Sequence, residues 1–148
     1  MKTLCYCLGL LLSAGVAQAQ TPTTIDHVAL LVQNLDSSAV FYTRLFGLPE
    51  LPNAFPKARV KWYRIGGQVQ LHLIEGLQAP VQLPQLAHLC LNVPTVGGFV
   101  QKLKQAGIAY YNGVGVPNTI TVRGDGVRQV FLQDPNGYWL EANDAAHH

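Results

Sequence analysis

The fold is decided by two short stretches of sequence, Asp26 to Val32 (DHVALLV) and Ala87 to Val93 (AHLCLNV). In each of them apolar residues alternate along the chain, as in a half-buried β-strand. The two stretches also match position by position, so that His27 in the first corresponds to His88 in the second. Such a match indicates that the chain contains two copies of one structural unit.

Each of these strands is followed by apolar residues at the spacing of an amphipathic helix. They are Val40, Phe41, Leu45 and Leu48 in the first copy, and Val96, Phe99, Val100 and Leu103 in the second. We expect Asp36 to cap the start of the first helix, since an aspartate side chain accepts hydrogen bonds from free backbone amides. Gly47 and Gly107 are expected to end the two helices, because glycine readily takes the left-handed conformation found there.

Each copy then closes with a predicted β-hairpin. The first hairpin joins residues 62–65 to residues 68–73 through Gly66-Gly67, and the second joins residues 129–132 to residues 138–141 through Asp134-Pro135-Asn136-Gly137. Glycine, proline, asparagine and aspartate are the residues that favour tight turns. Both halves of the chain therefore end in two neighbouring antiparallel strands.

Short extended pieces at residues 50–51 and 109–110 add one more strand to each copy. The sequence thus predicts an α+β fold made of two βαβββ modules, at about residues 24–78 and 85–144. In this fold two helices cover a curved antiparallel sheet that forms a cup.

Composition limits the classes of protein that the chain can represent. Its 148 residues correspond to one domain, and 49% hydrophobic against 12% charged residues indicate a packed globular core. The net charge is only +2, and the basic residues are scattered along the chain. Nucleic-acid binding calls for a concentrated basic stripe, so we expect no nucleic-acid partner.

The first 19 residues have the pattern of a secretory signal peptide. Lys2 precedes an apolar run over residues 4–16, and Ala17-Gln18-Ala19 supplies small residues for cleavage after Ala19. A permanent membrane anchor is the alternative, but the run is short for a bilayer core of about 30 Å. We therefore expect one domain over residues 20–148, periplasmic or secreted and free of the membrane, with Cys90 as its remaining cysteine.

Four residues with metal-ligand chemistry occupy equivalent places in the two copies. His27 corresponds to His88, and His72 aligns with Glu141 when the two hairpin turns are superposed. Strand alternation places all four on the face away from the helices. Three imidazoles and one carboxylate suit Zn²⁺, Ni²⁺, Co²⁺, Mn²⁺ or Fe²⁺ better than Mg²⁺ or Ca²⁺. The alternatives are half-buried polar histidines with no metal, or His72 acting beside the site as a base.

Several motifs resemble the vicinal oxygen chelate superfamily, which includes glyoxalase I, extradiol dioxygenases and bleomycin-resistance proteins. They are Ile25 to Leu48, Gln70 to Gly76, Ala87 to Val93 and Val130 to Asp144, the last containing DPNG-Y-x-x-E. The resemblance implies paired βαβββ modules around one divalent metal, held by His27, His88 and Glu141, and usually a homodimer. His72 falls where glyoxalase I has a glutamate that binds metal and transfers a proton.

The expected function is that of a metal-dependent lyase or isomerase of the glyoxalase type, acting on a small substrate with vicinal oxygens. His72 and Glu141 are the candidate catalytic residues, as proton carriers beside the metal. The candidate substrate-binding residues are Arg64, Arg123, Arg128, Gln70 and Trp139. An extradiol-type dioxygenase and a metal-free small-molecule binding protein are the alternatives.

Overall fold

The computed structural model describes residues 22–55 and 57–146, so the predicted signal peptide lies outside the described residues. The first half contains β1 (His27–Val32), α1 (Leu35–Phe46), β2 (Glu50–Leu51), β3 (Val60–Gly66) and β4 (Val69–Glu75). The second half contains β5 (His88–Asn92), α2 (Val96–Gln105), β6 (Thr121–Val122), β7 (Arg128–Gln133) and β8 (Trp139–Asn143). The predicted βαβββ order is therefore confirmed in both halves. None of the helices in the described part is long and apolar enough to cross a membrane.

Each half forms its own four-stranded sheet, in the order β1-β4-β3-β2 and β5-β8-β7-β6. The sequence predicted antiparallel sheets, but both sheets are mixed, because β1 pairs parallel with β4 and β5 pairs parallel with β8. The reason lies in the connections. The helix carries the chain back to the end of the sheet where β1 began, so β2 runs in the same direction as β1. β3 is antiparallel to β2 and β4 is antiparallel to β3, so β4 is parallel to β1.

The caps differ in part from the sequence expectation. Asn34, and not Asp36, caps α1, since its side-chain oxygen accepts a hydrogen bond of 2.9 Å from the Ser37 amide. Asp36 lies in the first turn, where a negative charge favours the positive end of the helix dipole. Gly47 ends α1 with a φ of 69°, and Gly107 follows the α2 cap with a φ of 66°.

The prediction of a strand at residues 109–110 is wrong. Tyr110 is instead buried in the core, and its hydroxyl donates to the Asn118 carbonyl over 3.3 Å. Tyr111 makes only isolated bridges, to Pro117 and Phe131. The chain forms a loop before the short edge strand β6, so burial of the tyrosine outweighed the local strand pattern.

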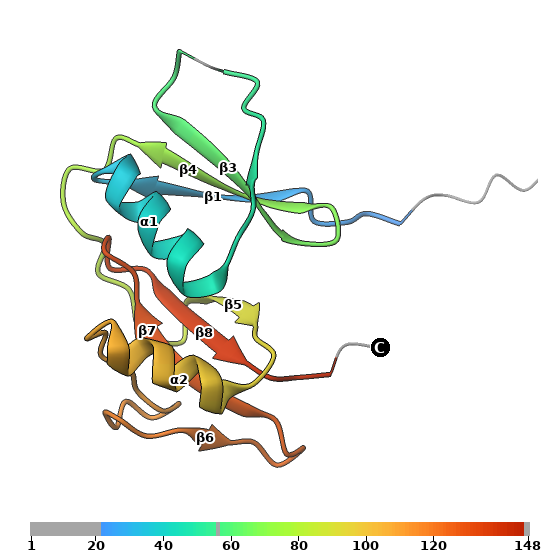
Figure 1. Cartoon of the computed structure of the whole chain (residues 1–148), viewed down its shortest axis with the longest axis vertical. Helices are drawn as coiled ribbons and strands as arrows, with labels where there is room; N and C mark the ends of the chain where they lie inside the picture. Colours follow the sequence, from blue (N-terminus) through green and yellow to red (C-terminus); the bar gives the residue numbers. More distant parts are fainter. Residues whose placement is uncertain (1–21, 56, 147–148) are drawn as a thin grey trace, which may run out of the picture.

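The helices and the apolar strand faces form the core, as predicted. Figure 1 shows α1 and α2 each lying across one face of its own sheet. In the first sheet Val32, Leu71 and Leu73 are fully buried against α1, and Leu132 and Leu140 are fully buried in the second. The opposite face of each sheet is left for the polar side chains of the candidate site.

The turn at residues 134–137 fastens the second module to the first. The Asn136 side-chain oxygen accepts from the Gln33 amide over 2.9 Å, and its Nδ2 donates to Ser38 Oγ over 3.1 Å. The Tyr42 hydroxyl donates to Asp134 Oδ2 over 3.0 Å. These bonds link α1 and the residue-33 turn before it to the hairpin of the other half, and so they help to fix the orientation of the two sheets.

Candidate functional site

His27 and His72 stack on neighbouring strands of the first sheet. The centroids of their rings are 4.3 Å apart, with an angle of 12° between the ring planes. Trp62 of β3 stacks on His72 with a centroid distance of 4.6 Å. The three side chains share the face away from α1, because His72 lies opposite Ala29 on one side and Trp62 on the other.

Each imidazole of this pair has a hydrogen-bond partner that fixes its tautomer. The Asp26 carboxylate lies 2.6 Å from His27 Nδ1, and the Gln70 side-chain oxygen lies 2.9 Å from His72 Nε2. Both partners only accept hydrogen bonds, so these nitrogens carry the hydrogens. His27 Nε2 and His72 Nδ1 keep their lone pairs. Burial lowers the pKa of His72, and the neighbouring His27 lowers it further, which favours the neutral imidazole.

His88 and Glu141 form the second pair, on β5 and β8. His88 Nε2 lies 3.2 Å from Glu141 Oε2, and Glu141 is only 7% exposed. His88 Nδ1 lies 3.0 Å from the Gln85 carbonyl oxygen, which only accepts, so the hydrogen of a neutral ring is on Nδ1. A lone pair of Nε2 then faces a carboxylate oxygen. This contact is favourable only with a shared proton or a bound cation.

The other oxygen of Glu141 is held by its neighbours. Asn143 Nδ2 donates to Glu141 Oε1 over 2.9 Å, and the Cys90 thiol donates to the same oxygen over 3.4 Å. Loss of hydrating water and the Glu141 carboxylate raise the pKa of the Cys90 thiol to about 12. Cys90 therefore stays protonated and acts as a donor to Glu141, which leaves Oε2 as the free ligand atom.

The four predicted ligands lie in two separate pairs, His27 with His72 and His88 with Glu141. A pocket lined by His88 and Trp139 is bounded on the β1 side by Val28 and Leu30. These two side chains point to the face of β1 opposite to His27. Within residues 22–55 and 57–146 no three histidine, cysteine or acidic side chains form one metal-sized group. The two pairs therefore belong to separate sheets and separate hollows.

The predicted substrate-binding residues lie at several places around these sheets. Arg64 donates to the Gly67 carbonyl and the Gln68 side chain, both over 2.8 Å, and Arg123 pairs with Asp125 over 2.6 Å in its own loop. Arg128 is exposed at the start of β7. Gln70 orients His72, and the Trp139 indole donates to the Leu83 carbonyl over 3.0 Å. Their roles toward a substrate stay predictions.

A cavity of about 530 Å³ adjoins the pair formed by His27 and His72. The remaining residues that line it are Phe55, Ala58, Arg59, Val60, Trp62, Ile74 and Glu75. Sequence reasoning missed Phe55 and Trp62. Alternation in the hairpin gives a signal for Trp62, because Trp62 pairs directly with His72, but Phe55 lies in a loop for which the sequence gives no register.

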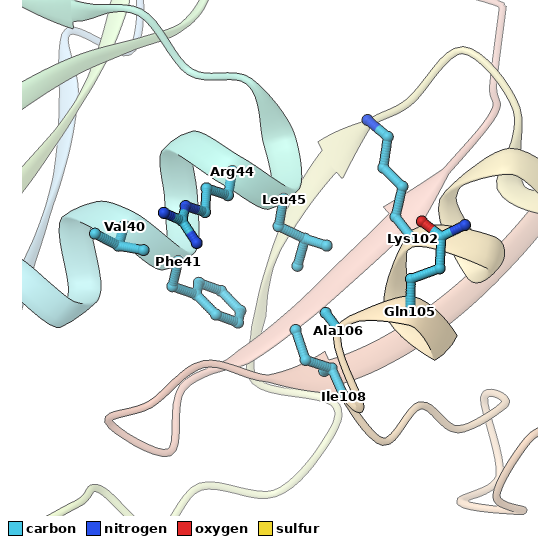
Figure 2. Close-up of a pocket in the computed structure, with 8 residues that line it drawn as sticks. All are labelled: Val40, Phe41, Arg44, Leu45, Lys102, Gln105, Ala106 and Ile108. Carbon is cyan, nitrogen blue, oxygen red and sulfur yellow. The ribbon is translucent and has the colours of Figure 1, made fainter.

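A second groove runs between the helices, away from the four ligands. Figure 2 shows its lining residues: Val40, Phe41, Arg44, Leu45, Lys102, Gln105, Ala106 and Ile108. Among these described residues there is no histidine, cysteine or carboxylate. This groove therefore lacks the histidine, cysteine and carboxylate side chains that bind transition metals or transfer protons at neutral pH.

Comparison with known proteins places the chain among relatives of this fold. The model of the Glyoxalase/Bleomycin resistance protein/Dioxygenase superfamily matches residues 24–142. Glyoxylase I 4 of Arabidopsis thaliana is 26% identical over 129 residues, which are 80% of this chain and 69% of that protein.

Solved structures share the fold at low sequence identity. Oxidase ChaP-H2 has a TM-score of 0.70 and 23% identity, covering 86% of this chain and 97% of its own. The lactoylglutathione lyase of Agrobacterium tumefaciens has a TM-score of 0.61 and 19% identity, covering 85% and 96%. The fosfomycin resistance protein FosX of Listeria monocytogenes has a TM-score of 0.63 and 16% identity, also covering 85% and 96%.

Proposed function

The chain belongs to the Glyoxalase/Bleomycin resistance protein/Dioxygenase superfamily, and on that premise we propose that it is a metal-dependent lyase or isomerase of the glyoxalase type. Its substrate is a small molecule with vicinal oxygens. The observation that carries the proposal is the contact of 3.2 Å between His88 Nε2 and Glu141 Oε2. Both atoms are free to bind a metal, because His88 Nδ1 and Glu141 Oε1 have other partners.

The chemistry of the donor set fits a divalent transition metal. Nitrogen and oxygen side-chain atoms are the ligands that such an ion takes in proteins. His88 Nε2 and Glu141 Oε2 lie 3.2 Å apart, close enough for both atoms to bind the same ion. Outer partners also orient each imidazole, namely Asp26 for His27, Gln70 for His72 and Gln85 for His88. Metal-binding histidines in proteins commonly have such partners.

We further propose that two chains complete the site. His27 and His72 of one chain would meet His88 and Glu141 of a second copy, so that a homodimer has two equivalent sites. The separate hollows of the two pairs support this arrangement, as does the exposed state of His27, whose side chain is 44% exposed. A two-fold axis relates the two sites of such a dimer.

The bound metal would act as a Lewis acid on a substrate carbonyl and acidify the adjoining C–H bond. The residues of the chain then handle the proton. The Gln70 side chain holds Nε2 of His72, so Nδ1 has the one available lone pair of this ring, and His72 can accept the proton only while Nδ1 is not bound to the metal. Glu141 Oε2 is the second candidate carrier, with Oε1 fixed by Asn143. Both groups are positioned by hydrogen bonds before a substrate binds, which favours proton transfer.

The predicted signal peptide supports a periplasmic or secreted location. Substrates conjugated to glutathione or coenzyme A are cytosolic, so we propose an unconjugated substrate. An extradiol-type dioxygenase is the second candidate. The observation in its favour is the combination of His27, His88 and Glu141, because two histidines and one carboxylate are the ligands of many non-haem iron oxygenases.

The test uses a chain that ends at Ala146, loaded separately with Zn²⁺, Ni²⁺, Co²⁺, Mn²⁺ or Fe²⁺. We expect at least one metal form to exchange the C–H protons of dihydroxyacetone with D₂O faster than the free ion does. His72→Ala and Glu141→Gln should lose this exchange. Oxygen consumption with catechol by the Fe²⁺ form would instead support the dioxygenase, and neither activity in any metal form would contradict an enzyme of this type.

A further inference from the structure

We infer that the groove between α1 and α2 binds a linear amphiphile with a single carboxylate headgroup, of the medium-chain fatty acid type. The apolar chain of this ligand lies between the two helices, and its carboxylate lies at the rim beside Arg44 and Lys102. Three features of the groove support the inference: an apolar recess, two cations without an acidic partner, and an elongated shape. The site is separate from the four candidate metal ligands and does not depend on them.

The recess between the helices is apolar although water reaches it. Figure 2 shows four apolar side chains around this space: Phe41, Leu45, Ala106 and Ile108. Leu45 is only 5% exposed and forms the floor, whereas Val40 on the α1 side is 48% exposed. Covering apolar surface of this kind stabilises a complex roughly in proportion to the area removed from water. An alkyl chain that enters the recess therefore gains binding energy along its length.

Two cations border this recess, one from each helix. Arg44 lies in the last turn of α1, and Lys102 lies in the last turn of α2. Within residues 22–55 and 57–146 neither of them forms an ion pair, and no aspartate or glutamate lines the groove. The helix dipole favours a cation in a last turn, but it does not account for apolar surface between the two cations. A carboxylate balances both charges, whereas a cationic headgroup is repelled by them.

The shape of the groove suits a linear chain. The main hollow has a volume of about 450 Å³, within the size range of small-molecule sites. A second hollow of about 200 Å³ adjoins it, and the two share Leu45 and Lys102. Phe46 and Phe99 line the second hollow and continue the apolar surface. A flexible alkyl chain is able to follow both hollows, whereas a compact ring system fills only one.

A free amphiphile fits this groove better than a bilayer or a second copy of the chain. Recognition of anionic lipid surfaces generally uses clusters of about four to eight basic residues, but the groove offers only Arg44 and Lys102. Leu45 lies at the bottom of the recess, so a flat surface laid across the two helices does not reach it. A single thin chain does reach it, and the headgroup then stays at the charged rim.

The experiment measures binding of dodecanoate, below its micelle concentration, to the chain that ends at Ala146 by isothermal titration calorimetry. EDTA is present, so that bound metal does not hold the carboxylate. We expect saturable binding in the parent and about tenfold weaker binding in Arg44→Gln combined with Lys102→Gln. The control combines Lys57→Gln with Lys104→Gln, which removes the same charge from residues that line neither hollow. It should leave the affinity unchanged, although Lys104 shares the last turn of α2 with Lys102.

Two further ligands test the headgroup and the chain separately. Dodecyltrimethylammonium has the same chain with a cationic headgroup, and hexanoate has the same headgroup with a shorter chain. Both should bind at least tenfold more weakly than dodecanoate. The inference is overturned if dodecanoate does not bind, if the two double variants bind it equally, or if the cationic amphiphile binds as tightly. Binding to phosphatidylglycerol vesicles without binding of free dodecanoate would identify a membrane contact and would overturn it as well.

Discussion

Glu141 is a nearly buried carboxylate whose two oxygens have different partners. Asn143 and the Cys90 thiol hold one oxygen, and His88 contacts the other. A buried charge is costly unless it is paired, so this arrangement commits Glu141 to a cation or a proton at Oε2. These partners account for a carboxylate in β8, a strand that is almost fully buried.

Two buried tyrosines show how a single hydroxyl affects stability. The Tyr42 hydroxyl donates to Asp134, whereas the Tyr63 hydroxyl has no hydrogen-bond partner among the described residues. We expect Tyr42→Phe to lower the free energy of unfolding by about 1–2 kcal/mol, because it leaves Asp134 short of a donor. Tyr63→Phe should be neutral or stabilising. Urea denaturation of both variants measures the difference, and an equal loss in both would contradict the account.

The same tyrosines predict a loss of stability in alkali. Burial raises the pKa of Tyr42 well above 10.0, and burial raises the pKa of Tyr63 to about 12. Their contribution is complete below the pKa of an unfolded tyrosine, about 10, and is lost as the pH rises toward the folded values. The free energy of unfolding should therefore fall above pH 10. Either Phe variant should show a shallower fall than the parent, and equal slopes would contradict the prediction.

At the scale of elements, the turn at residues 134–137 joins the two halves. Gly137 has a φ of 86°, and a Cβ there would lie 2.3 Å from the Val81 carbonyl oxygen. The Val81 amide also donates to the Asn136 carbonyl over 2.8 Å, so the chain between the modules is bound tightly to this turn. The glycine is thus required by its surroundings as well as by its backbone conformation.

A matched pair of variants separates these two requirements. Gly126 has a φ of 85°, with no atom within 4 Å of a Cβ. Gly126→Ala should cost about 1–2 kcal/mol for the left-handed backbone. Gly137→Ala should cost at least about 3 kcal/mol, because it adds a clash with backbone to the same strain. Thermal unfolding measures both, and equal costs would show that the turn does not pack against Val81 as described.

Sequence patterns predicted those features that depend on local alternation and turns. They gave the βαβββ order, the hairpins and the apolar faces, because each follows from side chains close together in the chain. They did not give the parallel pairing of β1 with β4, which depends on the path of the helix. They also misplaced β6, since burial of Tyr110 is a tertiary effect.

The candidate site shows the same limit. Repeat alignment identified His27, His72, His88 and Glu141 as one candidate site, and in the structure they lie in two contacting pairs, with 4.3 Å between the ring centroids of His27 and His72 and 3.2 Å between His88 Nε2 and Glu141 Oε2. The repeat alignment did not show that each pair belongs to its own sheet. That separation depends on how the modules dock, which no short stretch of sequence encodes.

At the scale of the molecule, the two pairs predict complementation between chains. Co-expression of His72→Ala with His88→Ala should yield mixed dimers in which one site has lost two ligands and the other has all four. Each homodimer should bind little metal, and the mixed dimer should regain about half of the parent content. Metal analysis of purified mixed dimers measures this. If the mixture binds no more metal than either variant alone, the site does not form across two chains.

The central claim is that His27, His72, His88 and Glu141 hold one divalent transition metal. The most direct test is elemental analysis of the chain ending at Ala146, after reconstitution and removal of free ion, beside His88→Ala and the control Gln129→Ala. Gln129 lies on β7 of the same sheet and has no part in the ligand set. We predict about one metal per chain in the parent and the control, and at least tenfold weaker binding in His88→Ala with its fold retained. A parent that binds no metal, or a His88→Ala variant that retains it fully, would contradict the claim.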